Sequence, residues 1–183
     1  MERQRKNLIF LTGFMGSGKS TIAPILANTL GYEYVDIDAE IEKLTGKKVS
    51  EIFSEHGEEY FRDVERTLLQ EVSRRHGCVV SLGGGTIANE NNLKIIKSSG
   101  LLIYLKTNAD QIFRRLRHKS DRPLLKTAEG ERLNEPDLRD RIQKLLITRE
   151  PFYNQSDFII QTDESPVGKT VDAIVRTIKS SIE

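Results

Sequence analysis

A glycine-rich loop between an apolar run and a helical pattern constrains this chain more than any other stretch. The run Leu-Ile-Phe-Leu leads into Gly13, Gly16, Gly18, Lys19 and Ser20, and these residues fit the pattern G-x-x-x-x-G-K-S. Glycines let the backbone approach an anion closely and adopt turns that a Cβ excludes. The following helix points its dipole and its unpaired N–H groups at the same place. The sequence therefore predicts a strand, a phosphate-binding loop and a helix.

The side chains of this loop indicate which phosphate compound it holds. Lys19 can reach the β- and γ-phosphates, and the hydroxyl of Ser20 can bind Mg²⁺. A turn that merely joins a strand to a helix needs one or two glycines and has no use for Lys-Ser-Thr after them. We expect the ATP-binding residues here to be Gly13, Gly16, Ser17, Gly18, Lys19, Ser20 and Thr21.

Length and composition limit the number of domains and the class of protein. A chain of 183 residues fits one domain, 1–183, that buries roughly two-thirds of its unfolded surface. A net charge of +1 with 30% charged residues lacks the basic excess of nucleic-acid-binding proteins. No run is long enough for a membrane span or a secretory segment. The one cysteine, Cys78, predicts a buried thiol, so we expect a cytoplasmic protein without disulfides.

Apolar strands alternate with helical patterns along the whole chain. The strands are expected near residues 8–12, 32–35, 78–82, 101–105 and 158–161. This alternation predicts a three-layer α/β/α fold whose five-stranded parallel sheet is covered by helices on both faces. Ligands of such folds bind beyond the carboxyl ends of the strands. The phosphate loop, Asp36-Ile37-Asp38 and Gly83-Gly84-Gly85 each follow a strand, and we expect them to meet in one crevice.

Asp36 and Asp38 leave the second strand two residues apart, so both can face one site. Near Mg²⁺ and a triphosphate, one carboxylate can order the water shell of the metal while the other accepts the proton of an attacking hydroxyl. An alternative is that Asp36 caps a helix and Asp38 is a first-turn acid. The two interpretations are compatible.

Two segments interrupt the alternation. Residues 39–75 are helical with breaks at Gly46 and Gly57, and their first part contains a small apolar group: Ile41, Leu44, Val49, Ile52 and Phe53.

Residues 119–136 are charged and show neither the period of a helix nor that of a strand, and their length predicts a mobile active-site lid or disorder. Arg122 in this window, held by the following proline, suits a developing phosphoryl charge. Taken alone, Arg62 and Arg149 are typical of solvated helix charges.

These motifs occur together in the order typical of one family. The chain resembles the shikimate kinases, enzymes of aromatic amino-acid biosynthesis within the nucleoside-monophosphate-kinase-like group of P-loop proteins. The resemblance covers essentially the whole length. It is carried by residues 13–20, by Asp36-Ile37-Asp38, by Gly57-Glu58-Glu59-Tyr60-Phe61-Arg62, by Gly83-Gly84-Gly85, by Arg122-Pro123-Leu124-Leu125 and by Arg149-Glu150-Pro151-Phe152-Tyr153.

The resemblance implies that the chain transfers the γ-phosphoryl group of ATP to the 3-hydroxyl of shikimate, with Mg²⁺. It implies that Arg62 and Arg149 hold the shikimate carboxylate, and that Asp38, Gly84 and Gly85 contact the ring hydroxyls. It also implies a substrate-binding region at about 39–61 and a lid at about 119–136.

For the reaction, the resemblance makes Asp38 the base and places Asp36 on the water shell of the metal. Lys19 and Arg122 would stabilise the transferring group, and Arg117 would pack on the adenine. The segment 162–166 resembles the adenine loop of the family, although Ser165 stands where many members have an arginine.

Two other functions remain open from the sequence. The same scaffold serves kinases of other small metabolites, such as gluconate or a nucleoside monophosphate. A nucleotide switch that binds a protein is disfavoured, because the chain contains neither N-K-x-D nor D-x-x-G. Shikimate and ATP are the expected partners of a monomer that binds neither nucleic acid nor membrane.

Overall fold

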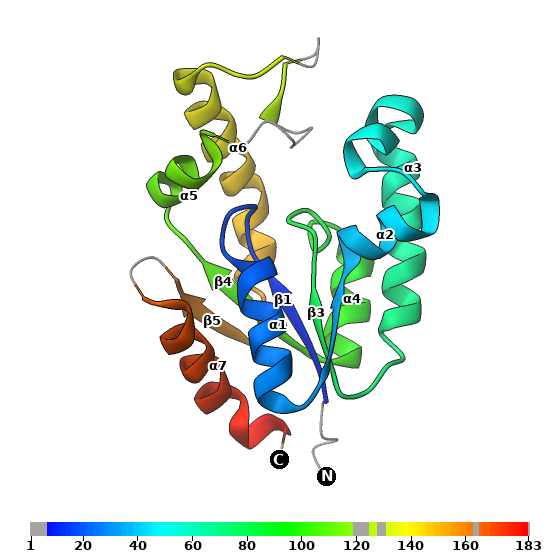
Figure 1. Ribbon diagram of the computed structural model, residues 1–183, viewed down its shortest axis with the longest axis vertical. Coiled ribbons are helices and arrows are strands. Elements are labelled where there is room, and N and C mark those ends of the chain that lie inside the picture. Colours follow the sequence, from blue (N-terminus) through cyan, green and yellow to red (C-terminus); the bar gives the residue numbers. More distant parts are fainter. Residues whose placement is uncertain (1–6, 119–124, 128–130, 163–164, 183) are drawn as a thin grey trace.

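Five parallel strands form the centre of the molecule (Figure 1). The structure is a computed structural model that describes residues 7–118, 125–127, 131–162 and 165–182. The strands are β1 (Leu8–Thr12), β2 (Glu33–Asp36), β3 (Cys78–Ser81), β4 (Leu101–Lys106) and β5 (Phe158–Gln161). Their order in the sheet is β2-β3-β1-β4-β5, and every pairing is parallel. The predicted sheet is confirmed, with boundaries shifted by a residue or so.

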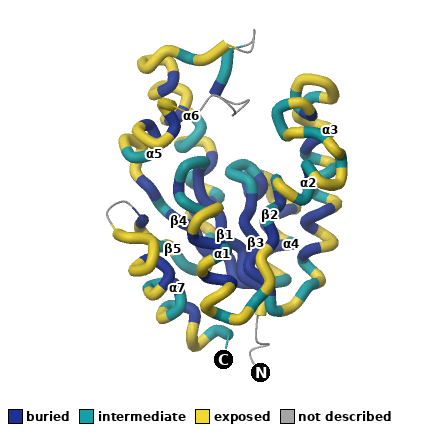
Figure 2. Tube along the Cα trace, in the orientation of Figure 1, coloured by how far each residue is buried: buried dark blue, intermediate teal, exposed yellow. Residues whose placement is uncertain are grey.

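Helices cover both faces of the sheet, as expected for a three-layer fold. They are α1 (Lys19–Leu30), α2 (Ile37–Thr45), α3 (Val49–Val72), α4 (Glu90–Ser99), α5 (Ala109–Leu116), α6 (Glu135–Tyr153) and α7 (Val167–Ile182). Because successive side chains of a strand point to opposite faces, Leu8 and Phe10 pack toward α3 and α4, while Ile9 and Leu11 pack toward α1 and α7. Figure 2 shows the buried sheet between helices whose outer surfaces are exposed.

The register of the strands aligns their carboxyl ends. Leu11 of β1 and Asp36 of β2 both lie opposite Ser81 of β3. The chain leaves these three neighbouring strands at the same edge, into the phosphate loop, into α2 and into the loop that contains Gly83. The expected convergence of the three stretches is therefore confirmed.

A third apolar cluster lies beside the phosphate loop. Phe14 packs there with side chains of α5 and α6, including Ile112, Phe113 and Ile142. Leu125 belongs to the same cluster, so part of the expected lid window is packed. Residues 119–124 and 128–130 of that window, including Arg122, lie outside the described residues.

The region 39–75 bends at the predicted glycines. Gly46 ends α2 in the left-handed conformation, and Gly57 interrupts α3 with φ of 82°. Ile41 and Ile52 are buried as expected, but Leu44 is 65% exposed. Among the described residues, no helix combines the length and the apolar character that a membrane crossing needs.

A glycine far from the loop edge joins α4 to the sheet. Gly100 has an extended backbone with φ of −156°, which any residue can adopt. A Cβ at Gly100 would lie 2.4 Å from the carbonyl oxygen of Leu8 and 2.9 Å from the ring of Phe10. Glycine is therefore required at this position because there is no room for a Cβ, and not because of the backbone conformation.

Candidate active site

The phosphate loop has the backbone that its glycines permit. Gly13, Gly16 and Gly18 have φ of 147°, 82° and 100°, values that side chains with a Cβ rarely adopt. At Gly13 space is limiting as well, because a Cβ would lie 2.6 Å from the carbonyl oxygen of Leu105. α1 starts at Lys19 without a side-chain cap, and the N–H groups of Thr21 and Ile22 donate to the carbonyl oxygen of Gly18. The positive end of the helix dipole therefore faces the loop, where it favours an anion.

Lys19 lies along this loop. Its Nζ donates to the carbonyl oxygens of Gly13 at 2.7 Å and Phe14 at 3.1 Å. The ammonium group is thereby held beside the N-terminus of α1, where the loop would bind phosphates. The hydroxyl of Ser17 is buried in the loop and has no hydrogen-bond partner within the described part of the chain.

A cavity of about 440 Å³ opens over the loop. Its walls come from the phosphate loop, the start of α1, the ends of β2 and β3, α5 and the segment before α7. The lining includes Met15, Gly16, Ser17, Gly18, Lys19, Ser20, Thr21, Asp36, Asp38, Gly83, Gly84, Arg115, Thr162 and Ser165. All expected ATP-binding residues of the loop except Gly13 thus face one space.

Asp36 and Asp38 line this cavity together. Asp36 also caps α2, because its Oδ1 accepts from the N–H of Ala39 at 3.1 Å, and its Oδ2 accepts from the hydroxyl of Tyr34 at 3.2 Å. Burial, followed by the charge of Asp36 and this hydrogen bond, raises the pKa of Tyr34 to about 12. Asp36 therefore combines the two roles that the sequence left open, as a cap and as a carboxylate in the cavity.

A smaller cavity of about 60 Å³ adjoins the first. Met15, Asp38, Gly83 and Gly84 line both cavities. The apolar wall of the smaller one consists of Val49, Phe53 and Phe61, and its polar wall includes Arg62, Glu65, Gly85 and Arg149. Asp38 therefore stands at the junction between a phosphate-binding space and a space lined by two arginines.

Arg62 and Arg149 converge on Gly85. The position of a Cβ at Gly85 would be 2.7 Å from Nη2 of Arg62 and 3.3 Å from Nη2 of Arg149. Arg149 is only 6% exposed, and its buried Nη1 has no hydrogen-bond partner within the described ranges. A buried guanidinium N–H without a partner is costly, so this geometry is suited to an incoming anion.

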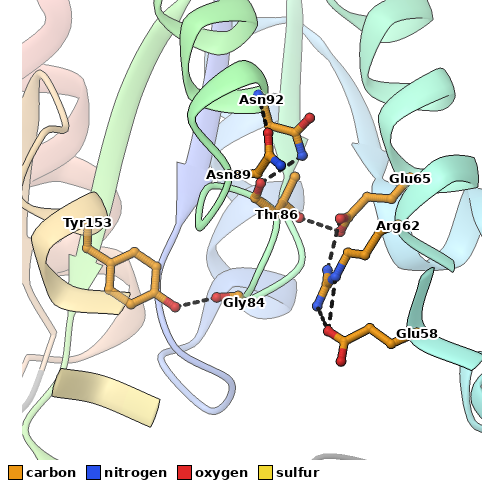
Figure 3. Close-up of polar contacts among 8 residues, drawn as sticks. All are labelled: Glu58, Arg62, Glu65, Gly84, Thr86, Asn89, Asn92 and Tyr153. Carbon is orange, nitrogen blue, oxygen red and sulfur yellow. Dashed lines mark hydrogen bonds and ion pairs between the residues drawn. The ribbon is translucent and has the colours of Figure 1, made fainter. Parts of the chain in front are cut away.

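Glu65 is a residue that the sequence reasoning missed. Its carboxylate is fully buried and accepts from Nη1 of Arg62 at 2.9 Å and from the hydroxyl of Thr86 at 2.6 Å. Asn92 in turn donates to the carbonyl oxygen of Thr86 at 2.9 Å, and Glu58 holds the outer edge of Arg62 (Figure 3).

These contacts fix the orientation and the charge of Arg62. Burial alone lowers the pKa of Arg62, but the charges and hydrogen bonds of Glu65 and Glu58 raise it above its ordinary value. The only sequence signal for Glu65 was an acid three residues after Arg62, a spacing typical of exposed helix pairs.

One arginine of α5 lines the large cavity. Arg115 lines the large cavity, and its Nη1 donates to the carbonyl oxygen of Gly16 at 2.7 Å. Arg117 is exposed and is not part of that lining; its Nε lies 3.0 Å from Nε2 of His118. Arg122 lies outside the described residues.

Comparison with known proteins identifies the family of the chain. A sequence model of the shikimate kinase family matches residues 15–179. A shikimate kinase of Chloroherpeton thalassium is 46% identical over 179 residues, 98% of this chain and 96% of its own length. A shikimate kinase of Chlorobium phaeobacteroides is 48% identical over 172 residues, 94% of this chain and 90% of its own length.

Solved structures show the same relationship. The shikimate kinase of Acinetobacter baumannii in complex with shikimate superimposes with a TM-score of 0.86 at 32% identity, covering 95% of this chain and 93% of that one. The shikimate kinase of Bacteroides thetaiotaomicron gives a TM-score of 0.85 at 34% identity, covering 94% and 98%. The chain therefore belongs to the shikimate kinase family.

Proposed function

We propose that the two adjoining cavities are the two substrate sites of this ATP-dependent shikimate kinase, with ATP in the larger and shikimate in the smaller. Membership of the family gives the reaction, which is transfer of the γ-phosphoryl group of ATP to shikimate. The same membership decides against the gluconate and nucleoside-monophosphate alternatives and against a non-enzymatic switch. The residue roles below are our assignment.

One observation carries the assignment of the shikimate site. The guanidinium groups of Arg62 and Arg149 come from different helices and meet beside Gly85, and the inner N–H of Arg149 is buried without a partner. Two planar donor groups at one point suit a carboxylate, which can accept two hydrogen bonds from each. Val49, Phe53 and Phe61 supply an apolar wall for the carbon ring.

ATP is assigned to the larger cavity by its phosphate-binding backbone. The triphosphate would bind the N–H groups of the loop 13–20 and the first turn of α1, with Lys19 on the β- and γ-phosphates. Arg115, from its place on the wall, is the described arginine suited to the nucleotide; Arg117 and Arg122 remain predictions. Thr162 and Ser165, which belong to the expected adenine loop, line the same cavity.

The donors present fit Mg²⁺. Ser20 and Asp36 offer oxygen atoms in the same cavity, and Mg²⁺ prefers oxygen ligands, keeps several waters and uses few protein groups. Within the described ranges no group of three or more His, Cys, Asp or Glu side chains is arranged to hold a metal, so phosphates and waters would have to complete the shell. Bound Mg²⁺ would neutralise charge on the β- and γ-phosphates.

Asp38 is assigned the proton transfer because it lines both cavities. A shikimate held by its carboxylate at Gly85 would present a ring hydroxyl toward Asp38, and that carboxylate can accept the hydroxyl proton. Phosphoryl transfer has a loose transition state, so most of the acceleration comes from positioning and charge stabilisation. Arg62 and Arg149, called the arginine clamp below, therefore support the reaction from a distance by orienting the acceptor.

An ADP-release assay tests the proposal. Purified chain with ATP and Mg²⁺ is expected to release ADP when shikimate is added, and not when gluconate or a nucleoside monophosphate replaces it. Arg62→Lys should weaken shikimate binding strongly. Arg66→Lys is a matched control, one turn further along α3, because Arg66 pairs with the exposed Asp63. Equal loss of shikimate binding in both variants would contradict the assignment of Arg62 and Arg149 as the pair that holds the carboxylate.

The expectations of a monomer in the cytoplasm, without nucleic acid or membrane, stay predictions.

A further inference from the structure

The loop Gly83-Gly84-Gly85 has no side chains with which to fix its own conformation. Two of its carbonyl groups accept short-range hydrogen bonds, from Thr86 to Gly83 at 3.1 Å and from Ala88 to Gly85 at 3.1 Å. The carbonyl oxygen of Gly84 accepts instead from the hydroxyl of Tyr153, which is 69 residues away. The middle peptide group of the loop is therefore oriented by α6.

Tyr153 is held firmly in place for this contact. Its side chain is fully buried, and its ring stacks on that of Tyr104 in β4 with centroids 4.8 Å apart. Burial raises the pKa of Tyr153 to about 12, against the opposing charge and hydrogen bond of Arg149. At neutral pH the hydroxyl keeps its proton, as that of any tyrosine does. An oriented, protonated hydroxyl can fix the direction of a carbonyl group.

Fixing the Gly84 carbonyl also aims the next N–H. In a trans peptide group the C=O of one residue and the N–H of the next point in opposite directions, and none of the peptide bonds in the chain is cis. Figure 3 shows Tyr153 on one side of the loop, with Arg62 and Glu65 on the other. The N–H of Gly85 therefore points away from Tyr153, toward the side of the loop where Arg62 lies, and no partner for it occurs within the described part of the chain.

The same helix supplies both parts of this arrangement. Arg149 and Tyr153 lie one turn apart near the end of α6. Arg149 contributes its guanidinium group beside Gly85, while Tyr153 sets the peptide group that precedes the Gly85 nitrogen. A shift of α6 would move both groups together.

We propose that Tyr153 is a positioning residue of the shikimate site: by holding the Gly84 carbonyl, it aims the Gly85 N–H between the two guanidinium groups, as a third donor for the substrate carboxylate. This inference rests on the proposed function, because it takes that carboxylate to bind at Gly85.

Tyr153→Phe tests the inference, since it removes the hydroxyl and keeps the ring. Loss of one aligned hydrogen bond should raise the KM for shikimate by about three- to tenfold. The contact would be made equally in the ground and transition states, so kcat should change by less than about threefold. The KM for ATP should stay within about twofold, because the phosphate loop keeps its own hydrogen bonds.

Tyr104→Phe is the matched control, because it removes the hydroxyl of the other ring in the same stack. A purely structural role for Tyr153 predicts that both variants lower the melting temperature and leave the KM for shikimate unchanged. That outcome would overturn the inference and leave the proposed function intact. A wild-type chain inactive toward shikimate would instead refute the proposed function.

Amide hydrogen exchange of the wild-type protein provides a test that does not depend on the folding of a variant. The amide proton of Gly85 is expected to become protected from exchange when shikimate binds, since it gains an acceptor. The amide of Gly168, which has no neighbour within 4 Å of its Cβ position, should exchange at an unchanged rate. Unchanged exchange at Gly85 with shikimate bound would overturn the inference.

Discussion

A single methyl group at Gly85 should disable the arginine clamp without unfolding the protein. The backbone of Gly85 has no positive φ, so alanine can adopt its conformation without strain. The new Cβ would lie 2.7 Å from Nη2 of Arg62 and 3.3 Å from Nη2 of Arg149. Both of these atoms are the far ends of flexible side chains, which can move aside.

The size of the effect follows from these distances. Nonbonded heavy atoms settle at about 3.5 Å or more, so the Arg62 nitrogen must retreat by roughly 0.8 Å. That displacement takes a hydrogen bond to the substrate carboxylate out of its normal range of about 2.7–3.2 Å. Losing one charge-assisted hydrogen bond costs about 1.5–3 kcal/mol, which raises the Kd for shikimate roughly 10- to 100-fold.

Titration calorimetry measures the affinity for shikimate, and thermal unfolding measures the stability of the variant. Gly85→Ala should bind shikimate weakly, while its free energy of unfolding stays within about 1 kcal/mol of the wild type. Gly168→Ala in α7 is the control, because a Cβ there meets nothing within 4 Å. A folded Gly85→Ala protein that binds shikimate within twofold of the wild type would refute the convergence of the two arginines at Gly85.

Three further outcomes are expected. Arg149→Lys, like Arg62→Lys, should weaken shikimate binding by about 1.5–3 kcal/mol in calorimetry, because a point charge cannot replace a planar pair of donors; near-normal affinity in both would count against the clamp. Asp38→Asn should fold normally and lower kcat by about 10²–10⁴, and wild-type turnover would remove its role as base. The pKa of Tyr153 is about 12 in the folded chain against an ordinary 10. Because the unfolded chain releases this proton first, the contribution of Tyr153 to the free energy of unfolding should stay constant below pH 10 and fall by about 2–3 kcal/mol up to pH 12. Tyr153→Phe should show a smaller fall in chemical denaturation; an identical pH profile would contradict the buried hydroxyl.

The sequence was sufficient to predict the sheet and the phosphate loop because both depend on local patterns. Runs such as Leu-Ile-Phe-Leu are buried on both faces of a parallel strand, and the positive φ values of Gly13, Gly16 and Gly18 follow from the motif. The register of parallel neighbours then placed Asp36 beside the loop after β3.

The surroundings of the arginine clamp could not be predicted from local sequence patterns. Glu65 has the spacing of an exposed ion pair with Arg62, yet it is buried because Thr86, from a loop 21 residues later, covers it. Leu44 shows the opposite error, since an apolar residue on a short helix looks like core but is 65% exposed. Helical periodicity gives the face of a helix, and only the tertiary packing determines what covers that face.

Gly100 has a practical consequence for anyone who maps this enzyme by mutation. Its side of the sheet is remote from either substrate, yet a Cβ there would press into the Leu8 carbonyl at 2.4 Å, as one at Gly13 would press into Leu105 at 2.6 Å. A growth screen in cells that depend on this kinase would score substitutions at both glycines as equally damaging. Intolerance to mutation would thus single out a glycine that only spaces a helix from a strand as readily as a glycine of the phosphate loop, and only the loss of soluble protein would tell the two apart.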